Sequence, residues 1–133
     1  ITHNTPMNRL LRPVRPLRWV GSSSKDLKGL PKQVRAAFGF GLHLAQTGLH
    51  PPNAKPLKGV GSGIVELLED FDGDTYRAAY VVRFEQAVYV LHVFKKKSKR
   101  GSATPQPDIE LIRRRLRDAE SDHAERMRKA GKQ

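Results

Sequence analysis

The sequence predicts an α+β domain, in which an antiparallel sheet is packed by two N-terminal helices and one C-terminal helix. An apolar period of three and four residues between Leu30 and Ala45 indicates the main helix. Three strand-like segments follow between Ile64 and Lys97, joined by short turns that favour antiparallel pairing. A second helical period follows Pro107. The expected order of elements is β-α-α-β-β-β-α.

The N-terminal half is expected to supply one strand and both N-terminal helices. Residues 1–16 are basic, contain three prolines and have no apolar period, so we interpret them as a flexible arm. Leu17–Val20 is a short strand candidate, and the serines after it can cap a helix over Lys25–Leu30. Pro31 suits the first position of the next helix.

Two glycines interrupt the apolar period of that second helix. Each of them, Gly39 and Gly41, weakens a helix by about 1 kcal/mol relative to Ala. We therefore expect a close contact between this part of the helix and the sheet.

The C-terminal half is expected to form an antiparallel meander and the last helix. After a loop over residues 53–63, the strands are expected at Ile64–Asp70, Thr75–Phe84 and Ala87–Lys97. Asp72-Gly73-Asp74 is a strong hairpin signal between the first two. A helix from about Ile109 to Ala124 would complete the domain, which we place at residues 17–124, before a polar tail over 125–133.

The composition indicates a partner that carries negative charge. The chain has 133 residues, with 25 Lys and Arg against 13 Asp and Glu, for a formal net charge of +12. Such a surplus fits nucleic acid, although an acidic protein or an anionic membrane surface would also be attracted. The absence of cysteine excludes disulfides and cysteine-based zinc sites. No segment suggests a membrane span or a signal peptide, so we expect a cytoplasmic protein without a membrane partner.

The last predicted strand ends in five cations within six residues. Strict alternation along it would place Val88, Val90, His92, Phe94 and Lys96 on one face of the sheet. His92 and Lys96 would then share a face, bringing a side chain that titrates near neutral pH close to a cation. The cluster itself consists of Lys95, Lys96, Lys97, Lys99 and Arg100.

Four segments together resemble the phage-derived HigB-like toxins of the RelE/ParE superfamily. They are KPLKG (55–59), VELLED (65–70), TYRAAY (75–80) and VLHVFKKKSK (90–99). The resemblance implies the toxin of a type II toxin–antitoxin pair, whose antitoxin is commonly a helix-turn-helix protein. It also implies cleavage of mRNA, often on the ribosome, whereas ParE relatives act on DNA gyrase with the same fold.

Carried onto this chain, the resemblance implies a site for RNA cleavage without a metal or another cofactor. Arg77 and Lys96 would stabilise the charge of the phosphate during attack by the 2′-hydroxyl. His92 or Glu66 would transfer protons. The cations expected to bind RNA are Lys55, Lys58, Lys95, Lys97, Lys99 and Arg100.

Other interpretations of the same residues stay open. His92 can be a buried, hydrogen-bonded histidine without a chemical role, and Arg77 can form an ion pair with Glu66 or Glu69. Relatives that cleave on the ribosome often have a tyrosine after the last strand, and residues 98–105 contain none. The alternative function is therefore a non-enzymatic toxin directed at gyrase, or an inactive module that binds nucleic acid or antitoxin.

Overall fold

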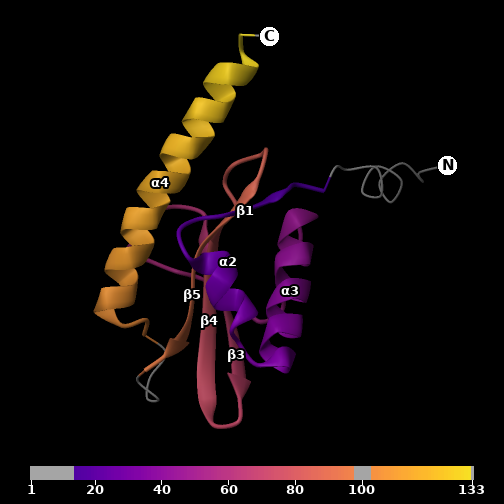
Figure 1. The fold of residues 1–133 in the computed structure, drawn as a ribbon, viewed down its shortest axis with the longest axis vertical. Coiled ribbons are helices and arrows are strands. Elements are labelled where there is room, and N and C mark those ends of the chain that lie inside the picture. The colour runs from indigo at the N-terminus through magenta and orange to yellow at the C-terminus, as the bar shows by residue number, and fades with distance from the viewer. Residues whose placement is uncertain (1–13, 98–102, 133) are drawn as a thin grey trace, which may run out of the picture.

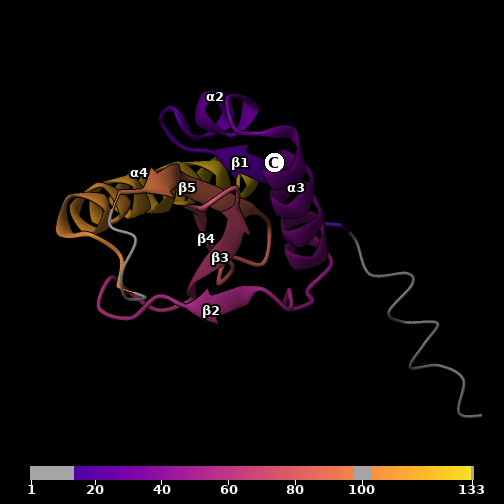
Figure 2. The same cartoon turned by 90° about the horizontal axis from the view of Figure 1, so that it is seen from below.

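A five-stranded mixed sheet lies between helices in the structure, a computed structural model that describes residues 14–97 and 103–132 (Figure 1). The α+β class is as predicted. The strand order is β1-β5-β4-β3-β2, with β1 and β2 at opposite edges (Figure 2). The strands are β1 (Leu17–Trp19), β2 (Ala54–Pro56), β3 (Ile64–Phe71), β4 (Asp74–Val81) and β5 (Val88–Lys96). The helices are α2 (Ser23–Lys28), α3 (Lys32–Gln46) and α4 (Gln106–Ala130).

The two edge strands correct the prediction of a purely antiparallel sheet. The central strands β3, β4 and β5 pair antiparallel, as their short connections require. β1 instead runs parallel to β5, with Leu17 opposite Val88 and Trp19 opposite Val90. No tight turn joins these two strands, so nothing local fixes their relative direction. β2 pairs antiparallel with β3 inside the segment that we predicted as a loop.

Element ends differ from the prediction by a few residues at most sites and by more at the C-terminal end. Helix α2 begins at Ser23 and not at Lys25, and Pro31 is the cap residue before α3 and not its first residue. The hairpin is confirmed, because Asp72 and Gly73 link β3 to β4 with φ values of 52° and 81°. Helix α4 continues to Ala130, so most of the predicted polar tail is helical.

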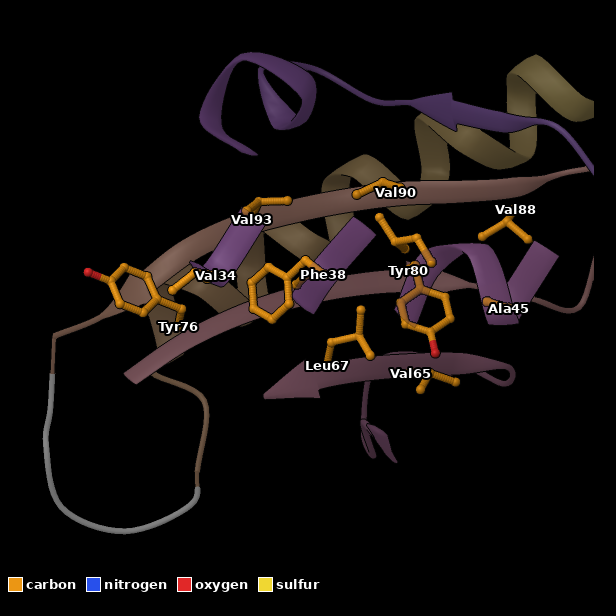
Figure 3. Packing of buried hydrophobic residues seen from close by; sticks show 12 residues of the cluster. Val34, Phe38, Ala45, Val65, Leu67, Tyr76, Tyr80, Val88, Val90 and Val93 are labelled. Atoms are coloured by element: carbon orange, nitrogen blue, oxygen red, sulfur yellow. The ribbon is translucent and has the colours of Figure 1, made fainter. Parts of the chain in front are cut away.

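The sheet carries a hydrophobic core on each face. On one face, α3 packs Val34 and Phe38 against the sheet (Figure 3). Leu42 of the same helix belongs to this core as well. On the other, α4 packs Ile112, Leu116 and Ala119. The sheet residues in the α3 core include Val65, Leu67, Tyr76, Ala78, Tyr80, Val88, Val90 and Val93, and those in the α4 core include Ile64, Ala79, Val81, Tyr89 and Leu91.

A bulge in β5 changes which residues share a face. Ala79 pairs with His92 and Tyr80 pairs with Val90, so Leu91 is an extra residue that interrupts the alternation. Val90 consequently lies in the α3 core, while Leu91 lies in the α4 core. The prediction that Val88 and Val90 share the face of His92, Phe94 and Lys96 is therefore wrong. The rest of the strand, beyond the bulge, keeps the predicted alternation.

The two helical glycines have different surroundings. A Cβ atom on Gly41 would lie 2.8 Å from Cδ2 of Leu67, a residue that is fully buried in the sheet. A Cβ atom on Gly39 would have no neighbour within 4 Å. The expected close contact is confirmed at Gly41 and is wrong at Gly39.

This difference predicts opposite effects of two alanine substitutions. Gly39→Ala should raise the free energy of unfolding by about 0.5–1 kcal/mol, because Ala is the better helix former and the site is open. Gly41→Ala should lower it, because the overpacking of Leu67 costs about 1–3 kcal/mol and outweighs the same helical gain. Urea unfolding of both variants measures the two changes. Equal changes at the two positions would contradict the assigned packing.

Candidate functional site

A buried ion pair lies on the α4 face of the sheet. Arg77 on β4 donates from Nη1 to Oε1 of Glu66 on β3, at 2.8 Å. The two side chains are 2% and 0% exposed. Of the interpretations left open for Arg77, the pair with Glu66 is the one that the structure contains. Since a buried charge requires compensation, each of these groups depends on the other for its stability in the fold.

Thr104 joins this pair from the segment between β5 and α4. Its hydroxyl donates to Oε2 of Glu66 at 2.8 Å, and it accepts from Nη1 of Arg77 at 3.4 Å. Both carboxylate oxygens of Glu66 are thus hydrogen-bonded. Thr104 could not be predicted from the sequence, because it is far from both partners along the chain and belongs to no recognisable motif.

Two lysines surround the same carboxylate. Lys55 on β2 is directly opposite Glu66 in the register with β3, so their side chains share a face. Lys96, at the end of β5, is 3% exposed, and its pKa is lowered by burial and by the positive charges of Arg77 and Lys55. Three cations therefore gather around one carboxylate, with an excess of positive charge. This grouping unites three of the predicted site residues.

A pocket of about 420 Å³ opens beside these residues. Its walls combine cationic and apolar side chains, which suits a ligand with both a charged and a flat apolar part. Lys58, another predicted RNA-binding residue, lines this pocket and so belongs to the site. The lining residues are Lys55, Pro56, Leu57, Lys58, Glu66, Ala103, Thr104 and Ile109.

The loop that carries Lys58 is attached to α4. Leu57 belongs to the α4 core, and Arg113 donates from Nη2 to the carbonyl oxygen of Gly59 at 2.8 Å. Gly59 has a φ of 86°, in the left-handed region that favours glycine. The KPLKG segment is therefore held in a defined position next to the pocket, between the edge of the sheet and the helix.

His92 lies on the same face but contacts α4. Its Nε2 is 2.8 Å from Oδ1 of Asp108, in the first turn of α4, and its ring stacks on Phe94. Nδ1 is buried, and no residue within 14–97 or 103–132 forms a hydrogen bond with it. Burial lowers the pKa of His92 and the charge of Arg115 adds to this, whereas the Asp108 carboxylate and, more weakly, Asp26 act in the opposite direction.

These contacts fit the alternative interpretation of His92 as a buried, hydrogen-bonded residue. The residue is 8% exposed and is not among the described residues that line the pocket. It joins β5 to the start of α4, and this role could not be read from the sequence because Asp108 is in a different element. A part in proton transfer stays a prediction.

The lowered pKa of His92 predicts how stability depends on pH. As the pH falls below about 6.5, the ordinary pKa of histidine, the unfolded chain binds a proton at His92 before the folded chain does. The free energy of unfolding should therefore decrease with falling pH in that range. His92→Gln should show a shallower decrease, measured by urea unfolding across a pH series. Identical pH slopes for the two proteins would exclude this contribution.

Of the remaining predicted RNA-binding residues, Lys95 and Lys97 do not join the cluster. Lys95 is exposed on the α3 face of the sheet, opposite Tyr76 in register, and its Nζ is 3.2 Å from Oδ2 of Asp74. Lys97 is exposed directly after β5. Lys99 and Arg100 lie outside the described residues. Strand alternation thus separates Lys95 from Lys96, so consecutive cations in the sequence serve different faces.

Two further observations on the described residues concern metal ligands and membrane spans. Within residues 14–97 and 103–132, no three His, Asp or Glu side chains are grouped closely enough to hold a metal ion. None of the helices in this part of the chain combines the length and the hydropathy that a membrane span requires.

Comparison with known proteins supports the RelE/ParE-like superfamily that the sequence segments suggested, whereas the likeness to HigB in particular stays a prediction. A model of the family described as "Phage derived protein Gp49-like (DUF891)" matches residues 25–117, which include the pair, both lysines and the His92 contact. No curated protein and no solved structure gave a significant match. The chain belongs to the Gp49-like family of phage-derived proteins, a family of RelE/ParE-like toxins.

Proposed function

We propose that this protein is the toxin of a type II toxin–antitoxin pair, similar to HigB, and that it inhibits translation by cleaving mRNA at the ribosome without a metal. One observation carries the proposal: Lys55, Arg77 and Lys96 converge around Glu66 next to a pocket lined by cationic and apolar side chains. Cations of this density bind phosphate, and the apolar walls suit a base or ribose. In this proposal the protein is cytoplasmic, and its partner is a helix-turn-helix antitoxin.

The chemistry requires three actions on one phosphodiester. A base removes the proton of the 2′-hydroxyl, cations stabilise the five-coordinate phosphorus, and the leaving 5′-oxygen takes up a proton. The products are a 2′,3′-cyclic phosphate and a 5′-hydroxyl. Arg77 and Lys96 supply the positive charge in this proposal. Glu66 belongs to the pocket lining and His92 is nearby on the same face, so these two are the groups for proton transfer.

A second candidate function rests on the burial of the same cations. Arg77 and Lys96 are 2% and 3% exposed, and Arg77 already pairs with Glu66. This favours a protein that binds without cleaving, directed at gyrase or limited to nucleic acid and antitoxin. Cleavage would require the phosphate to displace Glu66 from Arg77 and the covering side chain of Thr104 to move aside.

Cleavage in a translation extract distinguishes the two functions. The purified chain should degrade mRNA and leave 2′,3′-cyclic phosphate ends, and Arg77→Ala should reduce the rate by about 100-fold or more, the typical effect of removing a preorganised charge donor. Since Arg77→Ala can also disturb folding, Lys58→Ala tests the exposed rim of the pocket and should weaken RNA binding. Lys25→Ala, an exposed lysine on α2, is the matched control.

The absence of cleavage would contradict the proposed activity. If mRNA stays intact at every protein concentration, with and without ribosomes, the protein is not an endoribonuclease. A gyrase supercoiling assay on the same preparation would then identify or exclude the gyrase-directed toxin.

A further inference from the structure

A second pocket, with a volume of about 270 Å³, lies where the end of α3 meets the sheet. Val65 and Tyr80 line it from the sheet, where they are opposite each other in the register of β3 and β4. Ala45 near the end of α3 and Val82 just after β4 also line it. All four belong to the α3 core or pack against it. The pocket beside Glu66 lies on the other face of the sheet, so the two pockets are separate.

The turn after α3 adds an exposed apolar side chain to this pocket. Gly48 has a φ of 85°, in the left-handed region, and its N–H donates to the carbonyl of Ala45 at 3.0 Å. The chain turns back there, and the N–H of Leu49 donates to the carbonyl of Leu44 at 3.0 Å. Leu49 lines the pocket and is 47% exposed. An apolar ligand would cover part of this side chain, which favours its binding.

The hydroxyl group of Tyr80 is a polar group in an otherwise apolar part of this pocket. The residue is 1% exposed, and Figure 3 shows its oxygen pointing toward Val65. Within residues 14–97 and 103–132, no hydrogen bond involves this hydroxyl. Burial raises the pKa of Tyr80, so the phenol stays neutral and can donate its proton to an acceptor. An unpaired hydroxyl in an apolar environment is costly, and an oxygen atom of a ligand would remove that cost.

The pocket favours negative charge. Arg15 and His50 line it, and none of the described residues that line it is Asp or Glu. Arg15 donates to three backbone carbonyl oxygens, and its remaining N–H groups have no acceptor within the part of the chain that the structure describes. An anionic group in the pocket would be attracted by this guanidinium, and a cationic group would be repelled.

We infer that this pocket binds a small apolar molecule that carries one carboxylate. The apolar part contacts Val65, Val82 and Leu49, and the carboxylate accepts hydrogen bonds from the hydroxyl of Tyr80 and from Arg15. A cavity of about 150 Å³ is large enough for benzene. The volume of about 270 Å³ therefore accommodates a single ring, or a short branched chain, together with the carboxylate. The inference does not depend on RNA cleavage, because the pocket is on the opposite face of the sheet from Glu66.

Other occupants fit the pocket less well. A purely apolar molecule would leave the hydroxyl of Tyr80 unpaired. Inorganic phosphate would satisfy the polar groups and leave the apolar side chain of Leu49 exposed. A whole nucleotide would be too large, because ligands of that size occupy pockets of about 300–1,000 Å³.

Titration of the ¹⁵N-labelled full chain with benzoate, followed by ¹H–¹⁵N NMR spectra, tests the inference. Benzoate should cause saturable shifts of the backbone amide signals of Gly48, Leu49 and Val82. Benzyl alcohol has the same ring without the negative charge and should bind about tenfold or more weakly. Benzylamine has the same ring with a positive charge and should not bind.

Two tyrosine variants test where the carboxylate binds. Tyr80→Phe removes only the hydroxyl and should weaken benzoate binding by about tenfold or more. Its free energy of unfolding, measured with urea, should be no lower than that of the wild type, because the hydroxyl has no partner within the described residues. Tyr76→Phe is the matched control, since Tyr76 is a buried tyrosine of the same core that does not line the pocket. It should leave the affinity for benzoate unchanged.

Four results would overturn the inference. The first is the absence of saturable shifts up to the solubility limit of benzoate. The second is equal affinity of benzoate for the wild type and for Tyr80→Phe, or a lower stability of this variant without ligand. The third is binding of benzylamine as tight as that of benzoate. The fourth is that shifts are confined to amides such as those of Lys55 and Thr104, which would place the anion in the cationic cluster beside Glu66.

Discussion

Glu66→Gln is expected to lower the free energy of unfolding by about 3–5 kcal/mol, the usual cost of removing one partner from a buried ion pair. Glu66 is fully buried and is the carboxylate that compensates Arg77, with Lys55 and Lys96 close by. The amide keeps the size and some hydrogen bonding but removes the negative charge. The fold then has to bury an uncompensated guanidinium. Urea unfolding monitored by circular dichroism measures the loss.

A carboxylate on the opposite face of the same strand provides the control. Glu69 on β3 is half-buried on the α3 face, away from the cluster. Glu69→Gln should change stability by no more than about 0.5 kcal/mol. If Glu66→Gln lowers the free energy of unfolding no more than Glu69→Gln does, the ion pair between Arg77 and Glu66 makes no specific contribution to stability.

A double-mutant cycle isolates the coupling between the two charges. Arg77→Met and Glu66→Leu should each be strongly destabilising, whereas the double variant should lose much less than their sum, because no unpaired charge remains between these positions. Additive losses would show that the two side chains stabilise the fold independently.

The same variant connects stability with the proposed ligand. If phosphate binds among Lys55, Arg77 and Lys96, it supplies the negative charge that Glu66→Gln removes. A short RNA should therefore raise the melting temperature of Glu66→Gln more than that of the wild type, through linkage between binding and folding. An equal rise in both proteins would place the RNA elsewhere on the surface.

The sequence predicts well those parts of the fold that depend on local patterns. The hairpin at Asp72-Gly73 follows from turn chemistry, and α3 follows from its apolar period. The direction of β1 could not be predicted in this way, because it is set by pairing with a strand distant in the sequence. The bulge at Leu91 could not be predicted from the sequence either. Alternation gives no sign of an inserted residue when both faces of a strand are apolar.

The candidate site was predictable in its cations but not in their partners. Lys55, Arg77 and Lys96 were indicated by matched segments and lie together in the structure. Thr104 and Asp108, which hydrogen-bond Glu66 and His92, depend on how the chain returns from β5 to α4. Long-range contacts of this kind leave no periodic signal, so residue type alone could not assign them.

Arg15 shows the same limit at the other end of the chain, where we predicted a flexible arm through Pro16. Its guanidinium donates to three carbonyl oxygens, those of Val82 and Phe84 at 2.8 Å and that of Ala45 at 2.9 Å. Its backbone also pairs with Gln46 in both directions. The residue thus joins the end of α3 to the segment after β4, and the folded domain begins before the predicted boundary.

Arg15→Met is therefore expected to cost about 2–3 kcal/mol of unfolding free energy, because it leaves three partly buried carbonyl oxygens without a donor. Arg15→Lys should recover only part of the loss, since a single ammonium group cannot reach three acceptors arranged for a planar fork. Arg35→Met, an exposed arginine on α3, should be nearly neutral in the same urea unfolding experiment. If residues 14–16 were a flexible arm, Arg15→Met and Arg35→Met would be equally harmless. A large difference between them would instead show that Arg15 stabilises the fold by joining the end of α3 to the segment after β4.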